Sequence, residues 1–402
     1  MGQPILTPAF FQQNRARLAA TVPPQSLIII RGNTLVPRSD GQFYPFHQDS
    51  DFYYFTGVDL EDCALILQTD ADQAIETEIL MHPSIETLEL VWTGRMYALQ
   101  AIIQSDAFDR YELNKVFEDT LGTLTKTTDQ LILDKKQSHH LCAELQWSAD
   151  TALPLKTYSN ELRAIKQKEE IAMMREACAI TAKGLEELRE KIQVGVYEYE
   201  LANSLRHIFL QHQASGYAYP PIIASGASGI LLHYQQNNQK LQMGYLVLVD
   251  VGACYGHYQS DITRVFPVHE TFTPRQLAVY QQVQRVLEQL IGLLKPGLTF
   301  QALEDAGAQM ITKALLDLGV LTAAMVQQDA KAYKAFMPHR FAHLIGLDVH
   351  EDTSSRLLKA GMVLAIEPGI YIPREGLAIR LEDNVLITES GSEVLSLAPF
   401  ED

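Results

Sequence analysis

The sequence has no hydrophobic run long enough to span a membrane. A transmembrane helix needs about 20 consecutive apolar residues, whereas the longest apolar stretches here, at 27–30 and 246–249, are short and strand-like. The first 24 residues also lack an apolar segment behind a basic start, so we expect no signal peptide and no membrane partner. These absences favour a cytoplasmic location.

Positive charge and cysteine are both scarce. Against 49 Asp and Glu stand 32 Lys and Arg, which gives a formal net charge of −17. Nucleic-acid binding needs clustered basic side chains, so we expect no nucleic-acid partner, whereas an acidic protein attracts cations. The four cysteines lie far apart without a CxxC pair, which predicts reduced thiols rather than disulfides.

The sequence also lacks low-complexity tracts and short-period repeats. Its composition, 47% apolar and 20% charged, predicts well-formed cores. A length of 402 residues predicts two or three domains at about 150 residues each. We place a smaller α/β domain at residues 1–155 and a second α/β domain at 156–402.

Hydrophobic periodicity predicts the secondary structure of both domains. In the first domain we expect a helix at 8–20 and strands at 27–31, 52–56, 64–68 and 78–81. In the second we expect helices at 165–190, 198–211, 274–294 and 299–319, and strands at 245–252, 259–268, 363–366 and 377–388. Helix pairs and strand pairs thus occur twice after residue 161, which predicts two similar α/β halves that face each other.

Four acidic residues of the second domain are flanked by strand signals. Asp250 ends one apolar strand, and Asp261 follows eleven positions later in the next, with two glycines between them. A hairpin would bring these two carboxylates side by side, which is costly unless a cation is present. Glu367 and Glu382 also abut aliphatic residues, so we expect them to be buried with a partner.

His343 completes a candidate metal-binding set with these four acids. Oxygen-dominated ligation suits two divalent ions such as Mn²⁺, Co²⁺ or Fe²⁺, with Zn²⁺ as a further option. Such a pair can bridge a hydroxide nucleophile and polarise a carbonyl group. Each residue alone would be an ordinary cap, turn or structural histidine, so the prediction of a dinuclear hydrolase rests on the whole set.

The motifs around these residues resemble the pita-bread metallopeptidase superfamily, which includes methionine aminopeptidase, prolidase and aminopeptidase P. The similar segments are 249–252, 260–264, 343–351, 367–371 and 379–383. Segments 48–57 and 92–95 resemble the N-terminal domain of aminopeptidase P, which methionine aminopeptidases lack. The resemblance implies a pita-bread catalytic domain and a Xaa-Pro aminopeptidase, acting on peptides with proline in the second position and assembled as a homo-oligomer, a dimer or tetramer.

The resemblance also implies the ligand set. Two divalent metal ions, with Mn²⁺ favoured, would share the bridging ligands Asp261 and Glu382. One ion would also bind Asp250, and the other would also bind His343 and Glu367.

Further roles follow from the same resemblance. Glu367 would handle the proton of the bridging water, and His233 would bind substrate and shuttle a proton. His350 would stabilise the carbonyl oxygen as charge develops there, and His339 would help to wall the proline pocket.

Three more residues lie close to these motifs. Arg380 would either have a catalytic role, by orienting a carboxylate near the metals, or form a structural ion pair. Tyr371 would join it behind the ligands and help to bind the substrate. Arg340 stands where the family commonly has glycine, and such a cation beside the cleft would alter peptide preference.

Three alternatives remain open on the sequence. A prolidase would share the metal set but cleave Xaa-Pro dipeptides alone. Some pita-bread domains have lost their metals and serve as binding modules, and creatinase-like hydrolases work without metal. The complete ligand set disfavours the last two.

Overall fold

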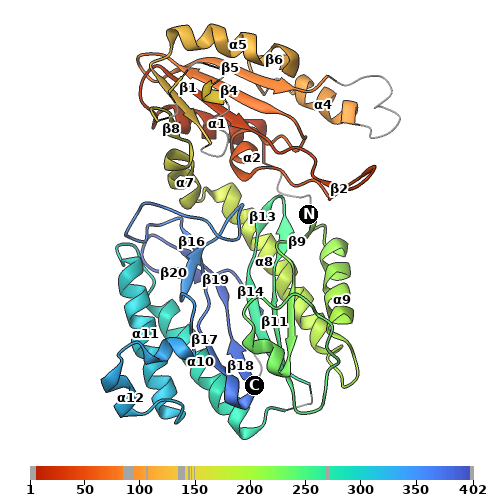
Figure 1. The fold of residues 1–402 in the computed structure, drawn as a ribbon, viewed down its shortest axis with the longest axis vertical. Coiled ribbons are helices and arrows are strands. Elements are labelled where there is room, and N and C mark those ends of the chain that lie inside the picture. Colours follow the sequence, from red (N-terminus) through yellow and green to blue (C-terminus); the bar gives the residue numbers. More distant parts are fainter. Residues whose placement is uncertain are drawn as a thin grey trace. The chain divides into compact units, whose positions relative to one another are not determined.

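The computed structural model describes residues 6–84, 95–105, 107–134, 141–143, 145, 147–148, 150–268 and 271–398. The chain divides into two compact units, residues 3–163 and 164–402 (Figure 1). Among the described helices, none combines the length and the apolar character that a membrane span requires.

The first unit is built on a mixed six-stranded sheet in the order β6-β5-β4-β1-β7-β8. The central strand β1 pairs antiparallel with β4 and parallel with β7, and its aliphatic side chains are buried. The strands of this unit are β1 (Ser26–Arg31), β2 (Pro37–Ser39), β3 (Gln42–Phe43), β4 (Ala64–Thr69), β5 (Ile75–His82), β6 (Arg110–Leu113), β7 (Gln130–Leu133) and β8 (Leu153–Pro154). The helices are α1 (Pro8–Ala19), α2 (Ser50–Thr56), α4 (Arg95–Gln104), α5 (Phe117–Leu124) and α7 (Lys156–Ala164), with 3₁₀ turns η1 (Asn114–Val116) and η2 (Thr125–Thr127).

The strand expected at 52–56 is wrong, because this segment forms the helix α2. Asp49 is the N-cap, and its carboxylate accepts a hydrogen bond from the Phe52 N–H at 2.9 Å. Gly57 ends the helix in the left-handed conformation, at φ 68°. The aromatic run favours a strand by propensity, but a cap at each end fixes a short helix.

The second unit repeats one arrangement twice, as the sequence predicted. In the first half, α8 (Lys168–Arg189) and α9 (Glu198–Gln211) pack together beside the strands; in the second half, α10 (Pro274–Leu293) and α11 (Phe300–Asp317) do the same (Figure 1). The first-half strands are β9 (Gly216–Tyr217), β10 (Ile222–Ser225), β11 (Leu246–Val251), β12 (Ala253–Tyr255), β13 (Tyr258–Gln259) and β14 (Ile262–Pro267). The second-half strands are β15 (Ala342–Leu344), β16 (Val363–Ile366), β17 (Gly369–Ile372), β18 (Leu377–Arg380), β19 (Asp383–Ile387) and β20 (Ser392–Val394). The remaining helices are α12 (Ala323–Gln328), η3 (Gly226–Ile230), η4 (Ala332–Ala335) and η5 (Pro373–Glu375).

Three expected elements in this unit need correction. The strand expected at 259–268 is interrupted at 260–261, between β13, which pairs with β12, and β14, which pairs with β11. The helix expected at 165–190 begins only at Lys168, because Gln167 is its N-cap and the Gln167 N–H donates to the Glu170 carboxylate at 2.8 Å. The strand expected at 377–388 is two strands: β18 pairs with β17, whereas β19 pairs with β16. The chain therefore changes sheets at residues 381–382.

Candidate metal centre

The structure gathers the five expected metal ligands at the ends of strands from both halves of the second unit. Asp250 lies in β11 and His343 in β15. The other three lie just outside strands: Asp261 precedes β14, Glu367 follows β16, and Glu382 lies between β18 and β19. Because β11 and β14 pair antiparallel, the carboxylates of Asp250 and Asp261 lie side by side, as the expected hairpin requires.

The imidazole of His343 faces three of the carboxylates. Its Nε2 atom lies 3.6 Å from Asp261 Oδ2, 3.8 Å from Glu382 Oε1 and 3.9 Å from Glu367 Oε1. These separations are too long for hydrogen bonds, but they suit donors that each lie about 2.0–2.2 Å from one cation. The Nδ1 atom is 3.2 Å from the Leu344 carbonyl oxygen, so Nδ1 carries the proton and Nε2 keeps its lone pair for a metal.

The Tyr219 hydroxyl links Asp250, the fourth acid, to the carboxylate of Asp261. It lies 2.6 Å from Asp250 Oδ1 and 2.5 Å from Asp261 Oδ1. Sequence reasoning missed this residue, since a tyrosine in the loop before β10 carries no motif or periodic signal. Its place follows from the pairing of β10 with β11, which sets Ile222 opposite Asp250.

The cluster is rich in buried acidic groups. Burial raises the pKa of Glu367 to about 8, although the nearby Arg380 opposes the change. Burial, and then the neighbouring carboxylates, raise the pKa values of Asp261 and Glu382 well above their usual range. Buried acids in such numbers need positive charge, so this donor set fits divalent cations.

Arg380 lies beside the cluster rather than between its ligands. Its guanidinium donates to Asp250 Oδ2 and to the Tyr371 hydroxyl, the latter at 2.8 Å. The hydroxyl of Thr263 donates to Glu382 Oε2 at 2.7 Å. These contacts orient two of the carboxylates, and Thr263 is a second residue that sequence reasoning missed.

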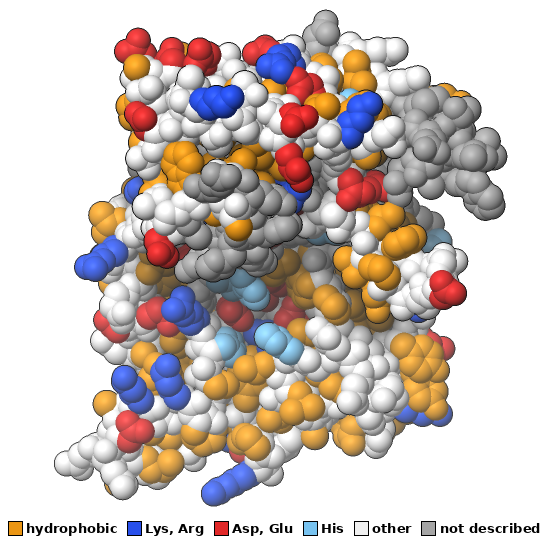
Figure 2. Space-filling view, turned by 45° about the horizontal axis from the view of Figure 1, so that its top comes forward, with side chains coloured by type: hydrophobic (Ala, Val, Ile, Leu, Met, Phe, Trp, Pro, Cys, Tyr) orange, Lys and Arg blue, Asp and Glu red, His pale blue; other side chains and the backbone are white. Residues whose placement is uncertain are grey.

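A cavity of about 410 Å³ opens onto the cluster, and His233, His339 and His350 line it. The Nε2 atom of His339 is hydrogen-bonded to the Tyr371 hydroxyl at 2.8 Å, and its Nδ1 atom lies 3.5 Å from Glu367 Oε2. Burial lowers the pKa of His339 to about 4, so this ring is neutral near pH 7. Histidine and acidic side chains share one hollow of the surface in Figure 2.

Most of the expected residues therefore contact the same cavity. Tyr371 stands behind it and reaches it through the hydrogen bonds to His339 and Arg380. The aminopeptidase P-like motif at 92–95 falls almost entirely outside the described residues.

Fold and site together define a class of protein. Two helix–strand halves hold four carboxylates and an imidazole at their strand ends, and a separate α/β domain precedes them in the sequence. This is the architecture of a metal-dependent hydrolase with the pita-bread fold.

Comparison with known families gives the family itself. The sequence profile of metallopeptidase family M24 matches residues 172–389, and that of the aminopeptidase P N-terminal domain matches residues 11–133. The chain belongs to metallopeptidase family M24.

Individual relatives match along nearly the whole chain. The Xaa-Pro aminopeptidases of Haemophilus influenzae and Escherichia coli are each 32% identical, over 96% of this chain and 94% of the relative. Aminopeptidase P from E. coli, in its low-pH form, superposes with a TM-score of 0.92 at 30% identity, covering 99% of this chain and 97% of that one. Proline aminopeptidase P II from Yersinia pestis gives a TM-score of 0.92 at 31% identity, covering 98% of each chain. These matches confirm the fold class and the family resemblance.

Proposed function

We propose that this chain is a Xaa-Pro aminopeptidase, which removes the N-terminal residue from peptides with proline in the second position. The observation that carries the proposal is the meeting of five metal-type ligands in one cluster beside a cavity. The substrate class is supported by the names of the two relatives at 32% identity.

The cluster would hold two divalent ions, of which Mn²⁺ is the favoured one. Asp261 and Glu382 would contribute to both sites, Asp250 to one, and His343 and Glu367 to the other. When bound, the ions would activate a water molecule for attack and polarise the scissile carbonyl group. Carboxylate-rich ligation is typical of Mn²⁺, and Co²⁺, Fe²⁺ and Zn²⁺ are the alternatives.

Glu367 would move the proton. Its carboxylate lies at the edge of the cluster, 3.5 Å from His339 and 3.9 Å from His343, and it lines the cavity. It is therefore placed to accept a proton from the attacking water and to deliver one to the departing nitrogen. Proline leaves as a secondary amine, so this nitrogen needs that proton.

The cavity histidines would hold the peptide. His350 packs edge-on against His343 with ring centroids 4.4 Å apart. This contact supports a role beside the reacting carbonyl group, where the His350 N–H would stabilise the developing charge. His233 lies on the same cavity and His339 near Glu367. We assign substrate binding and proton shuttling to His233, and a wall of the proline pocket to His339.

Arg380 and Tyr371 would act through their neighbours. Arg380 donates to Asp250 and to the Tyr371 hydroxyl, and that hydroxyl also contacts His339. One chain of contacts thus links a metal ligand to the proline pocket. We assign these two residues to positioning, because their hydrogen bonds go to site residues.

The proposal is tested by chelation and metal replacement. The protein should cleave Ala-Pro-Ala, lose activity with excess chelator and recover it with Mn²⁺, Co²⁺ or Zn²⁺. Unchanged turnover in excess chelator would contradict a metal mechanism, and cleavage of Ala-Pro without Ala-Pro-Ala would establish a prolidase instead. Asp250→Asn should abolish the recovery, whereas Asp317→Asn, at an exposed pair with Lys313, should retain it.

The surroundings of the enzyme form part of the proposal. We infer a cytoplasmic location, supported by four buried thiols, which suit a reducing compartment. We also infer a dimer or tetramer from the family resemblance. Light scattering coupled to size-exclusion chromatography measures the mass, and a monomer at micromolar concentration would contradict this inference.

A further inference from the structure

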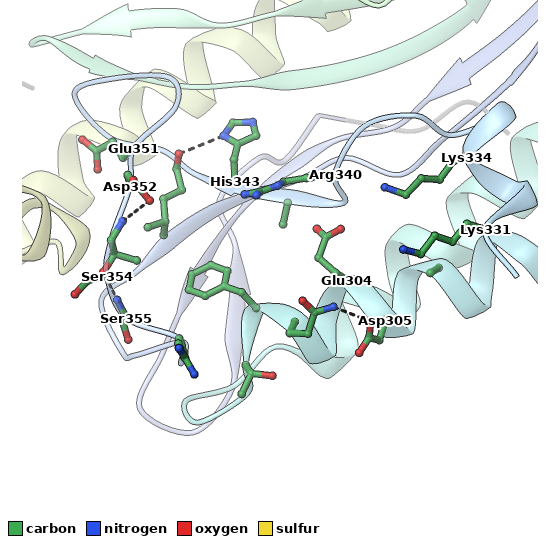
Figure 3. A pocket seen from close by; sticks show the side chains of 18 of the residues that line it. Glu304, Asp305, Lys331, Lys334, Arg340, His343, Glu351, Asp352, Ser354 and Ser355 are labelled. Atoms are coloured by element: carbon green, nitrogen blue, oxygen red, sulfur yellow. Dashed lines mark hydrogen bonds between the residues drawn. The ribbon is translucent and has the colours of Figure 1, made fainter.

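A second cavity, of about 960 Å³, adjoins the metal centre within the same unit. His343 lines both cavities, so the second one lies next to the metal-binding cluster. Figure 3 shows one side of this cavity formed by Lys331, Lys334 and Arg340, above and beside Glu304. We call these three cationic residues the basic wall.

The basic wall carries positive charge without a close partner. None of its three side chains forms an ion pair or a hydrogen bond with any residue that the structure describes. The acids beside the wall are already engaged: Glu304 accepts a hydrogen bond from the Phe341 N–H at 3.0 Å, and Asp305 accepts one from the Gln301 amide at 2.8 Å. Three cations thus face two carboxylates that are already hydrogen-bonded, and they can bind a further carboxylate without first breaking a contact.

Glu351 and Asp352 lie on the opposite side of the cavity. The Glu351 side chain is buried and its carboxylate is paired with Lys166 at 2.8 Å. Of the four Lys and Arg residues that line the cavity, three belong to the basic wall and the fourth is Arg356.

The position of Arg340 connects the basic wall to the substrate path. His339 lines the metal cavity, and the next residue along the chain, Arg340, lines the second one. If His339 borders the proline pocket, residues after the proline reach Arg340 next, because one peptide unit spans about 3.3–3.6 Å. The basic wall is then placed to meet the third residue of the peptide.

We propose that Lys331, Lys334 and Arg340 bind a carboxylate group on the part of the substrate that follows the proline, and so favour acidic or short peptides. This inference rests on the proposed function and specifies its substrates further. The carboxylate is either the side chain of Glu or Asp at the third position or the C-terminus of a tripeptide. Partly exposed ion pairs each contribute about 0.2–1 kcal/mol, so the expected preference is modest.

The test compares matched peptides on the Mn²⁺-loaded protein. Ala-Pro-Glu-amide against Ala-Pro-Gln-amide isolates the side chain, and Ala-Pro-Gln against its amide isolates the C-terminus. In at least one pair the anionic peptide should have a KM about fivefold lower at equal kcat, since the contact is made in the ground state and the transition state alike. The ratio should fall toward 1 in high salt, which screens exposed charges.

Variants of the basic wall show which residues cause the lower KM for anionic peptides. Arg340→Gln should lower the KM ratio, and the triple variant Lys331→Gln/Lys334→Gln/Arg340→Gln should bring it to about 1, with cleavage of the neutral peptides unchanged. Lys313→Gln, at an exposed site on α11 outside the cavity, should keep the ratio. Because all three wall residues are exposed, thermal melting should show the fold intact.

The outcomes separate this inference from the proposed function. Equal KM values within both pairs, or a ratio that survives the triple variant, would overturn the basic wall while leaving the aminopeptidase in place. A preference for acidic residues at the first position alone would also overturn it. If neither neutral peptide is cleaved under any metal, the proposed function itself fails.

Discussion

Metal-free protein should become less stable as the pH rises from 6.5 to 8. In the folded chain the carboxyl groups of Asp261, Glu367 and Glu382 have raised pKa values, so they retain protons that the unfolded chain releases. Stability falls with pH wherever the folded state binds more protons. For Glu367 alone, with a pKa of about 8 against 4.5, the loss over this range is about 1.5 kcal/mol.

Histidines set the lower limit of that window. Burial lowers the pKa of His339 and of His343 from 6.5 to about 4, so between these values the unfolded state binds the extra protons. The histidine contribution to stability therefore rises with pH up to about 7.5 and opposes the carboxyl contribution there. Between pH 6.5 and 8 the two histidines together offset about 0.8 kcal/mol of the carboxyl loss, so the net change still lowers stability.

Urea unfolding of the chelated protein, followed by circular dichroism, measures the effect. Both tryptophans, at 92 and 147, belong to the first unit, so their fluorescence serves as an internal reference that should not shift. Glu367→Gln should reduce the pH dependence, whereas Glu375→Gln, at an exposed pair with Arg275, should keep it. A metal-free protein that grows more stable between pH 6.5 and 8 would refute the reasoning.

Three further predictions concern single side chains. Glu367→Gln should lower kcat on Ala-Pro-Ala by about 10²–10⁴-fold, as expected for loss of a proton-transfer group, and a residual rate within tenfold of wild type would contradict its role. Gly252→Ala should prevent folding of the second unit, because the added Cβ would lie 1.7 Å from the Ser260 carbonyl oxygen; a soluble variant with an unchanged melting temperature would show that the hairpin can move. Asn384→Leu should cost about 3 kcal/mol of unfolding free energy, because the Asn384 amide makes two hydrogen bonds of 2.9 Å with the buried backbone of Asp261; urea unfolding measures this, and a loss below about 0.5 kcal/mol would contradict it.

Sequence patterns predicted the regular elements well where local signals agreed. The helix α9 and the strand β16 have the expected bounds, and Thr273 caps α10 with Pro274 at its first position. The strand prediction for 52–56 failed because the aromatic residues favour a strand while the capping residues favour a helix. The N-cap Asp49 and the terminator Gly57 fix the helix. Reading the cap and terminator before the propensity would have found this helix.

Prediction of the site residues was likewise limited to those with a clear local signal. Acids and histidines at the ends of apolar strands stand out in a sequence, because such residues are costly to bury singly. Tyr219, Thr263 and Asn384 do not, since neutral polar residues fit most loops and strands equally well. Their contacts depend on which strands pair and in what register, and no single segment carries that information. The domain limits 1–155 and 156–402 stay a prediction.

The Tyr219 hydroxyl indicates where a proton is held in the metal-free cluster. It lies within hydrogen-bond distance of both Asp250 and Asp261, yet a phenol has one proton to donate. A further proton on Asp261 would relieve this competition, and burial together with the nearby Asp250 carboxylate raises the pKa of Asp261 in that direction.

Metal binding must displace such protons, because ligands bind metal in their deprotonated form. Because Glu367 has a pKa of about 8 and those of Asp261 and Glu382 are also raised, filling the site at pH 7 should release at least about one proton per chain. Titration calorimetry of Mn²⁺ into chelated protein, in two buffers with different ionisation enthalpies, counts them. Equal binding enthalpies in both buffers would mean that no proton leaves, and that the carboxyl groups are already ionised in the metal-free protein.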